Sequence, residues 1–272
     1  VLNLQNGRFM IDKKEFLLQS IIKAYIEHLE PIGSTQLKSM YDITYSPATI
    51  RGYFKKLGEE GYLAQEHISS GRTPTIEALK QYWESKLNFK LKGLNLRALE
   101  YFASEIGLSV FIKKEKSDVL KDILNVENKY MILEFSSFAI SVKYSDALYR
   151  FLNDMIGLDL KDITKVSKDV GAYEVYESIN QTLQNSDFQI FNYKEFLNLA
   201  LNYDFDEYTI NSFLKGQILD ELTEGLYFDK LLPSNYIGIC NYCKINNEDV
   251  KMLVIGELPK DYEYFYEKIT TF

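Results

Sequence analysis

Apolar residues recur at helical spacing through the first part of the chain. Residues 12–29 carry one apolar face and stop before Pro31, which predicts a scaffold helix. Residues 46–60 repeat the pattern, with Ile50, Phe54 and Leu57 at i, i+4 and i+7. This stripe predicts a second amphipathic helix that packs on its neighbours and leaves its other side to solvent.

Two helix starts can be recognised from the residue types. Ser46 followed by Pro47 is typical of an N-cap and first helical position, and Ser34, after the turn at 31–33, is expected to cap a short helix over 34–41. Two short helices in this order, after a scaffold helix, predict a helix-turn-helix.

A β-hairpin is expected directly after the second helix. Residues 62–68 alternate like a strand, and the chain turns at 69–71 before Arg72 and Pro74. Such a hairpin would act as a wing, with Arg72 at its tip entering a minor groove. The sequence therefore predicts a winged helix-turn-helix that binds double-stranded DNA.

The residues expected to contact DNA lie on the solvent side of these elements. Hydroxyl, amide and basic side chains and the amides of a helix N-terminus bind phosphates, and the first residues of a recognition helix reach base edges. The predicted DNA-binding residues are Ser34, Thr35, Gln36, Lys38, Ser46, Ala48, Thr49, Arg51, Gly52, Lys55, Lys56, Ser69, Ser70, Arg72 and Thr73. The alternative is a small helical domain with a solvated charged face and a hairpin that binds protein.

After position 95 the pattern becomes a mixture of helices and strands. A short strand is expected at 109–112, a hairpin over 129–144, and a second hairpin formed by 236–243 and 251–256. Helices are expected at 96–106, 147–156 and 260–269, and Trp83 is expected to anchor the connection at 75–87 by packing. Strands at both ends of a largely helical stretch predict one α/β domain interrupted by an insertion at about 158–233.

The charge is distributed unevenly. The chain of 272 residues has a formal net charge of −8, but residues 1–86 carry 11 Lys and Arg against 10 Asp and Glu. The acidity therefore belongs to the rest of the chain, and a near-neutral head with basic groups on one face remains compatible with phosphate binding. No uninterrupted apolar stretch has the length of a membrane span, so we expect a cytoplasmic protein.

Four motifs in the head resemble the N-terminal domain of the heat-inducible transcription repressors of the HrcA family. They are EPIGSTQL at 30–37, SPATIR at 46–51, LGEEGYL at 57–63 and SSGRTP at 69–74. The family pattern has asparagine and an acidic residue after the arginine, where this chain has Gly52 and Tyr53. Base contacts expected at those two positions are thereby put in question.

The resemblance implies an α+β chain in four segments: a winged-helix DNA-binding domain at 1–90, a GAF-like domain in two parts at 95–157 and 234–272, and an inserted, mainly helical dimerisation segment at 158–233. It also implies a homodimer that represses chaperone genes at an inverted-repeat CIRCE operator, with a GroEL-type chaperonin keeping it active and heat relieving repression. A second hypothesis is a regulator whose GAF-like body senses a small effector.

No motif for catalysis or cofactor binding is present. The chain lacks the glycine-rich phosphate loops, and neither His28 nor His67 has the context of a catalytic base. We therefore expect no enzyme, cofactor or metal. Cys240 and Cys243 form one C-x-x-C, for which core packing, a redox pair or a metal shared between subunits are the possible roles.

Overall fold

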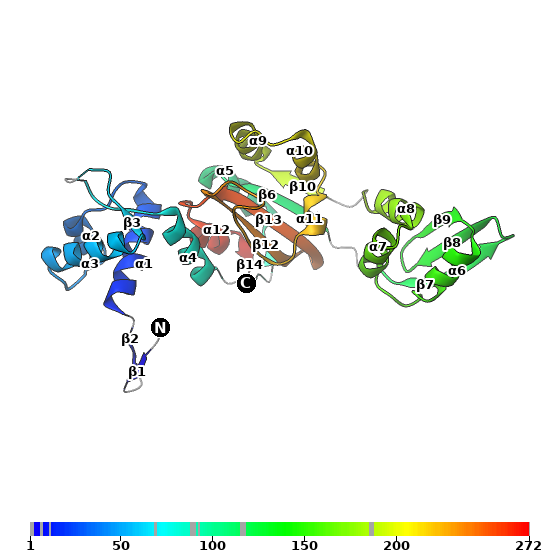
Figure 1. The fold of residues 1–272 in the computed structure, drawn as a ribbon, viewed down its shortest axis with the longest axis horizontal. Helices are drawn as coiled ribbons and strands as arrows, with labels where there is room; N and C mark the ends of the chain where they lie inside the picture. The colour runs from blue at the N-terminus through cyan, green and yellow to red at the C-terminus, as the bar shows by residue number, and fades with distance from the viewer. Residues whose placement is uncertain are drawn as a thin grey trace. The chain divides into compact units, whose positions relative to one another are not determined.

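The chain divides into two compact units in the computed structural model, which describes residues 3–5, 8–10, 12–67, 70–87, 91, 93–114, 118–184 and 188–271. One unit combines Val1–Phe111, Ile190–Asn246 and Met252–Phe272; the other consists of Ile112–Gln189 and Asn247–Lys251 (Figure 1). Two short strands, β1 (Asn3–Gln5) and β2 (Arg8–Met10), pair antiparallel ahead of the first helix.

The N-terminal part consists of helices and one short hairpin. Its elements are α1 (Lys13–His28), α2 (Ser34–Met40), α3 (Pro47–Glu59), β3 (Leu63–Ala64), β4 (Thr73–Pro74) and α4 (Ile76–Lys86). The side chain of Asp12 accepts a hydrogen bond from the Lys14 amide and so begins α1. The apolar faces of α1 and α3 are buried, and the predicted stripe of Ile50, Phe54 and Leu57 is confirmed.

The body is built on a seven-stranded sheet. Its strands are β5 (Gly93–Leu94), β6 (Ser109–Lys114), β10 (Phe188–Phe191), β11 (Gly225–Tyr227), β12 (Tyr236–Ile245), β13 (Glu248–Glu257) and β14 (Thr270–Thr271). The order is β10-β6-β13-β12-β5-β14, and β11 pairs with β12. Most residues of β12 and β13 are buried, as expected of strands covered on both faces.

Helices complete the body. They are α5 (Leu96–Ile106), α9 (Tyr193–Asn202), α10 (Glu207–Leu214), α11 (Ile218–Glu221) and α12 (Tyr262–Ile269). The rings of Phe102 in α5 and Tyr264 in α12 meet edge to face, with centroids 5.6 Å apart. Phe111, Phe196 and Phe213 form a buried aromatic cluster between β6, α9 and α10. The predicted α+β class is confirmed, and the sheet with its helices is consistent with a GAF-like domain.

The second unit has its own sheet and core. The sheet has three antiparallel strands, β7 (Leu120–Val126), β8 (Tyr130–Phe135) and β9 (Ala139–Lys143). Three helices follow it in the chain: α6 (Asp146–Asn153), α7 (Leu160–Asp169) and α8 (Tyr173–Gln184). Alternate strand residues such as Met131, Leu133 and Val142 are buried in a core shared with Leu152, from α6, and Ile179, from α8.

These boundaries differ from the predicted insertion at 158–233. The predicted hairpin at 129–144 is present as β8 and β9, but these strands pair with β7 and with one another instead of joining the seven-stranded sheet. Residues 190–233 lie in the unit that contains the main sheet. The second unit thus consists of Ile112–Gln189, which contains three strands and three helices, and of Asn247–Lys251 at the start of β13.

A buried carboxylate fixes one turn of the second unit. Asp118, only 5% exposed, accepts hydrogen bonds from the Val119, Ser136 and Ser137 amides at 2.8, 2.6 and 3.0 Å and from the Ser137 hydroxyl at 2.5 Å. Burial by itself would raise the pKa of Asp118, but these hydrogen bonds outweigh it and hold the pKa below the usual value. The ionised form therefore stabilises the folded unit.

Replacing this carboxylate should lower stability in a pH-dependent way. We expect Asp118→Asn to reduce the free energy of unfolding at pH 7 by about 1–3 kcal/mol, because an amide nitrogen would face amide donors. A carboxyl whose pKa is lowered by folding stabilises above its unfolded pKa and loses that effect as the pH falls through its folded pKa. The gap between wild type and variant should therefore shrink below about pH 4, measured by urea unfolding and circular dichroism.

Asp154→Asn provides the control, because Asp154 is exposed after the end of α6. This variant should unfold like the wild type at every pH. A similar loss in both variants, or a gap for Asp118→Asn that does not change with pH, would contradict the role given to the ionised carboxylate.

Candidate nucleic-acid interface

The start of α3 is fixed by two residues that the sequence singled out. The Ser46 hydroxyl accepts a hydrogen bond from the Thr49 amide at 3.1 Å and lies 2.9 Å from the Thr49 hydroxyl, and Pro47 occupies the first turn. The predicted cap of α3 is confirmed. The exposed Ser46 and Thr49 thus lie beside the N-terminal amides of this helix, where an anion is favoured.

The solvent side of α3 has small residues next to basic ones. Ala48 and Gly52 are one turn apart and exposed, and a methyl group added at Gly52 would meet no atom within 4 Å. Lys55 and Lys56 are exposed on the same side; the Lys55 ammonium lies 3.8 Å from Glu59, an exposed pair that stabilises little. This side can approach a flat or grooved anionic surface closely.

Helix α2 begins one residue earlier than the predicted cap implied. Gly33 is the N-cap, Ser34 is the first helical residue, and the Gln36 side chain accepts a hydrogen bond from the Gly33 amide at 3.3 Å. The predicted N-cap role of Ser34 was therefore wrong. Its hydroxyl accepts a hydrogen bond from Nη1 of Arg51 at 3.3 Å, which joins α2 to α3 at the surface. Thr35 is exposed beside it.

Lys38 lies near the end of α2 and is half-buried. Arg51 is exposed and uses one of its five N–H donors on Ser34, so the others remain available to a ligand. The structure thus brings together the predicted residues of α2 and α3 on adjoining surfaces.

The side chains of the hairpin make hydrogen bonds within the hairpin itself, whereas the sequence predicted contacts with DNA. The Ser70 hydroxyl donates to the His67 carbonyl at 2.8 Å and accepts from the His67 amide at 3.1 Å, and Gln65 donates to the Ser70 carbonyl. Ser70 therefore closes the turn of the hairpin. Thr73 pairs with Ala64 in the two-stranded ladder. Ser69 lies outside the described residues.

Arg72 lies on the loop side of the ladder, directly before β4, and its backbone pairs with Ile32, so the prediction that it sits at the tip was wrong. Its amide donates to the Ile32 carbonyl and its carbonyl accepts from the Ile32 amide, both at 2.9 Å. These two hydrogen bonds tie the hairpin to the loop that precedes α2. The Arg72 side chain is half-buried.

Gly71 allows this close approach. A methyl group at Gly71 would lie 2.6 Å from the carbonyl carbons of Pro31 and Ile32 and from the carbonyl oxygen of Pro31. The two loops can therefore pack backbone to backbone only because Gly71 lacks a side chain. This contact, which we call the loop clasp (Pro31, Ile32, Gly71 and Arg72), was missed by sequence reasoning, although both segments had been singled out as motifs.

Known proteins match the C-terminal part of this chain and also nearly its whole length. A family model described as the HrcA C-terminal domain matches residues 83–272. Proteins named heat-inducible transcription repressor HrcA from Helicobacter pylori strains J99 and 26695 are each 30% identical over 96% of this chain and 95% of their own length. The chain belongs to the HrcA family.

Two further likenesses are to a shorter HrcA match and to a solved structure. The HrcA protein of Thermotoga neapolitana is 38% identical over 94 residues, which are 34% of this chain and 28% of that protein. The crystal structure of a hypothetical protein aligns at a TM-score of 0.48 and 18% identity, covering 95% of this chain and 96% of the other.

HrcA is a family of transcription repressors and not of enzymes, which confirms the expectation of no catalysis. Within the described part of the chain, no helix is long and apolar enough to cross a membrane. The same residues contain no group of three or more His, Cys, Asp and Glu placed to hold a metal ion.

The two cysteines of this HrcA chain are core residues. Cys240 is fully buried and Cys243 nearly so, and burial, together with the neighbouring Cys240, raises the pKa of Cys243 to about 12. A thiol with this pKa is protonated near neutral pH and is a poor nucleophile. Core packing, one of the three predicted roles, accounts for the burial of both cysteines.

Two glycine substitutions should change the stability of the head in opposite directions. Gly71→Ala forces a methyl group against the loop clasp and should lower the free energy of unfolding by about 1–3 kcal/mol, as overpacking does. Gly52→Ala adds the same methyl group in open space within a helix and should raise it by about 0.5–1 kcal/mol. Urea unfolding of both variants measures these changes, and a Gly71→Ala variant as stable as the wild type would show that the clasp is not tight.

Proposed function

We propose that this chain is a homodimeric transcription repressor that binds an inverted-repeat, CIRCE-type operator of heat-shock genes. The observation that carries the proposal is the surface formed by α2, the start of α3 and the clasped hairpin. Residues 1–90 would be the DNA-binding domain, in a winged helix-turn-helix arrangement. A protein that acts on chromosomal DNA would work in the cytoplasm.

In this arrangement α3 is the recognition helix. Its N-terminal amides, with Ser46 and Thr49, are suited to hold a phosphate, and Arg51 is suited to read a base edge because Ser34 fixes one side of its guanidinium. Lys55 and Lys56 would neutralise phosphates. Ala48 and Gly52 would let the helix backbone approach DNA, and they offer no side chain for base readout.

The remaining predicted residues would hold the flanks of the site. Thr35, Gln36 and Lys38 would contact the backbone from α2, and Arg72, Ser69, Ser70 and Thr73 from the hairpin. The clasp positions Arg72 beside α2, so we expect the hairpin to contact DNA together with that helix and not as an independent arm.

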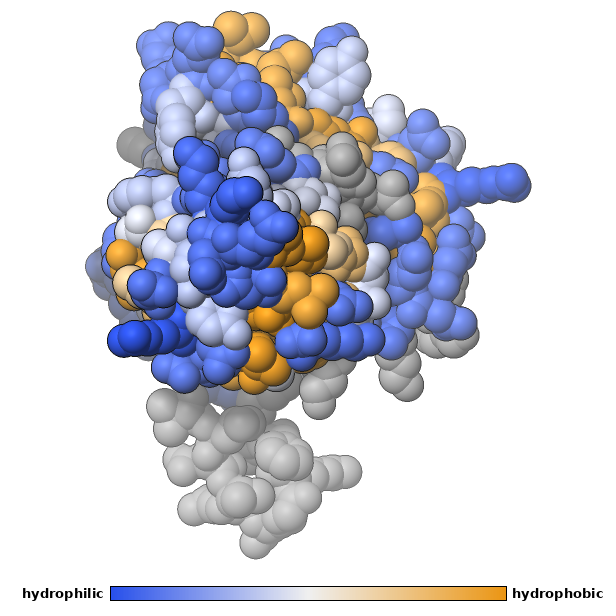
Figure 2. Space-filling view, turned by 90° about the vertical axis from the view of Figure 1, so that its right-hand side faces the viewer, coloured by the Kyte–Doolittle hydropathy of each residue, from blue (hydrophilic) through white to orange (hydrophobic). Residues whose placement is uncertain are grey.

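Dimerisation is expected to involve the unit Ile112–Gln189. Its sheet has one face in the core, while the other carries Leu124, Val126 and Tyr130, which are 48%, 41% and 51% exposed; Val126 and Tyr130 are paired across β7 and β8. Hydrophobic residues are visible among the hydrophilic ones at the surface in Figure 2. Apolar groups of this kind favour contact with a second subunit, and a two-fold dimer matches an inverted repeat.

Variants of α3 should separate base contacts from phosphate contacts. Arg51→Ala should cost about 1–3 kcal/mol of binding and relax specificity at one base pair. Lys56→Ala should weaken binding to all sequences about equally and reduce the salt dependence. Footprinting and titrations over a range of salt concentrations, on an inverted repeat and on a scrambled duplex, measure both effects.

Lys165→Ala is the matched control, because Lys165 is an exposed lysine of α7 and the proposal gives it no contact with DNA. It should bind like the wild type. If the wild type did not discriminate the inverted repeat from the scrambled duplex, or if one monomer sufficed for full affinity, the proposed function would be wrong.

Regulation by a GroEL-type chaperonin is part of the proposal and rests on the family resemblance; the relatives are named as heat-inducible repressors. Such control requires a repressor of marginal stability. Mild heating of the purified protein should abolish operator binding, and chaperonin should raise the active fraction without entering the DNA complex. Electrophoretic mobility shifts measure operator binding, and titration with operator DNA measures the fraction of protein able to bind it. Heat-stable binding that is indifferent to chaperonin would favour control by a small effector instead.

A further inference from the structure

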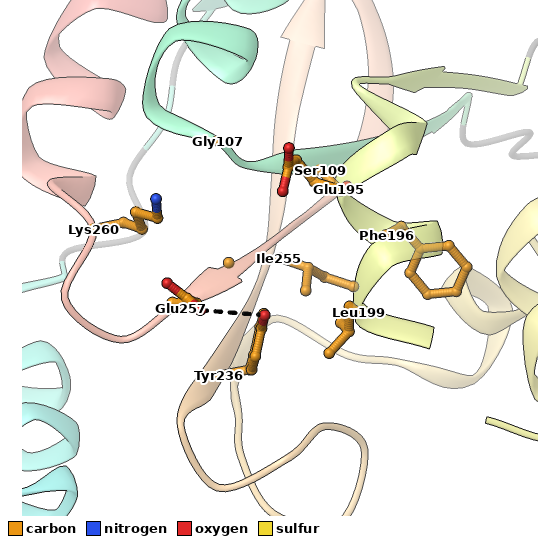
Figure 3. Close-up of a pocket in the computed structure, with 10 residues that line it drawn as sticks. Gly107, Ser109, Glu195, Phe196, Leu199, Tyr236, Ile255, Glu257 and Lys260 are labelled. Carbon is orange, nitrogen blue, oxygen red and sulfur yellow. Dashed lines mark hydrogen bonds between the residues drawn. The ribbon is translucent and has the colours of Figure 1, made fainter. Parts of the chain in front are cut away.

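A small pocket opens on the body. It has a volume of about 100 Å³ and lies between the start of β6, the end of β13 and helix α9 (Figure 3). Its inner wall is buried and includes Phe196, Leu199 and Ile255, while charged side chains surround it. An apolar wall with a few polar groups is typical of ligand sites, and this volume suits a ligand of only a few heavy atoms.

Opposite charges line this pocket without joining one another. Figure 3 shows Lys260 on one side, Phe196 and Leu199 on the other, and Glu195 and Glu257 between them. Among the residues that the structure describes, neither the Glu195 carboxylate nor the Lys260 ammonium has a hydrogen-bond or ion-pair partner. An acid and a base that share a pocket in this way can each bind one end of a ligand.

Two further polar groups of the pocket, Tyr236 and Glu257, are joined by a hydrogen bond. The Tyr236 hydroxyl donates to Oε1 of Glu257 at 3.4 Å. Burial first, and then the negative charges of Glu257 and Glu195, raise the pKa of Tyr236 to about 12. Tyr236 therefore remains protonated, and Glu257 remains an additional acceptor beside Glu195. The pocket thus offers two carboxylates to a cation and one ammonium to an anion.

We propose that this pocket binds a small zwitterion, an α-amino acid with a hydrogen or methyl side chain. Its ammonium group would lie between Glu195 and Glu257, its carboxylate would face Lys260, and a methyl group would lie against the apolar wall. A ligand with one charge would leave either the acids or the base without a partner. This site goes beyond the proposed function, because nothing in operator binding requires it.

The pocket wall is connected to the head. Leu258, between Glu257 and Lys260, accepts a hydrogen bond from Nε1 of Trp83 at 2.8 Å, and Trp83 lies in α4, the helix that follows the hairpin. The Tyr262 hydroxyl donates to the Glu257 carbonyl, and its ring meets the Trp83 ring edge to face. A ligand that shifts the segment 257–260 would alter the surroundings of Trp83, the only tryptophan.

Trp83 fluorescence and isothermal titration calorimetry on the full chain, without DNA, test the proposal. Glycine and alanine are the probes, and methylammonium and acetate, which carry one charge each, are the comparison. Glycine and alanine should bind and change the fluorescence. The single-charge analogues should bind at least about tenfold more weakly, because each loses one charged partner.

Variants locate the site. Glu195→Gln and Lys260→Met should each weaken glycine binding by about tenfold or more, while the exposed controls Glu207→Gln, in α10, and Lys194→Met, in α9, should bind like the wild type. Circular dichroism checks that all four remain folded. Absence of binding up to about 10 mM, equal binding of the single-charge analogues, or unchanged binding in both pocket variants would overturn the proposal. None of these outcomes depends on DNA binding.

Discussion

The buried indole of Trp83 connects the N-terminal helices to the body of the same unit. Trp83 is almost completely buried, its N–H donates to the Leu258 carbonyl, and its ring packs edge to face on Tyr82 and Tyr262. A buried indole needs a partner for its N–H, and the loop after β13 supplies it. The ion pair between Lys80 and Asp229, at 2.7 Å, adds a second contact from the same helix. Helix α4 is thereby fixed to the sheet of the body.

The other end of α4 is fixed to the hairpin. The Thr75 hydroxyl donates to the Gly61 carbonyl and accepts from the Ala78 amide, so it caps α4 and holds the end of α3 with one side chain. The loop clasp then ties the hairpin to the start of α2 through Gly71 and Ile32. Helix α3, the hairpin and α4 are therefore joined by short hydrogen bonds and backbone contacts. Such preorganisation lowers the entropy that DNA binding would cost.

The hydrogen bond of Trp83 also connects helix α4 with the wall of the pocket on the body. The segment 257–260 forms part of the pocket wall and also receives the Trp83 hydrogen bond. A ligand can influence a distant site only through a difference in its interactions with two states of the protein. A segment shared by the pocket and by the anchor of α4 is a place where such a difference could arise. The proposed control by a chaperonin and by a small ligand would be compatible in one repressor, because both would act on the fraction of protein able to bind DNA.

The sequence by itself determined the local structure and the family. Capping by Ser46 and Pro47, the stripe of Ile50, Phe54 and Leu57, and the alternation in β8 and β9 depend on near neighbours, so their patterns can be read directly. Only the tertiary structure decided which sheet β8 and β9 join, because alternation reports a buried face but not its partner strand. It also decided that Arg72 pairs with Ile32, that Gly71 packs on Pro31 and Ile32, and that Glu195 and Lys260 share a pocket. Each of these contacts joins residues about 40 or more positions apart, and no local propensity encodes such a distance.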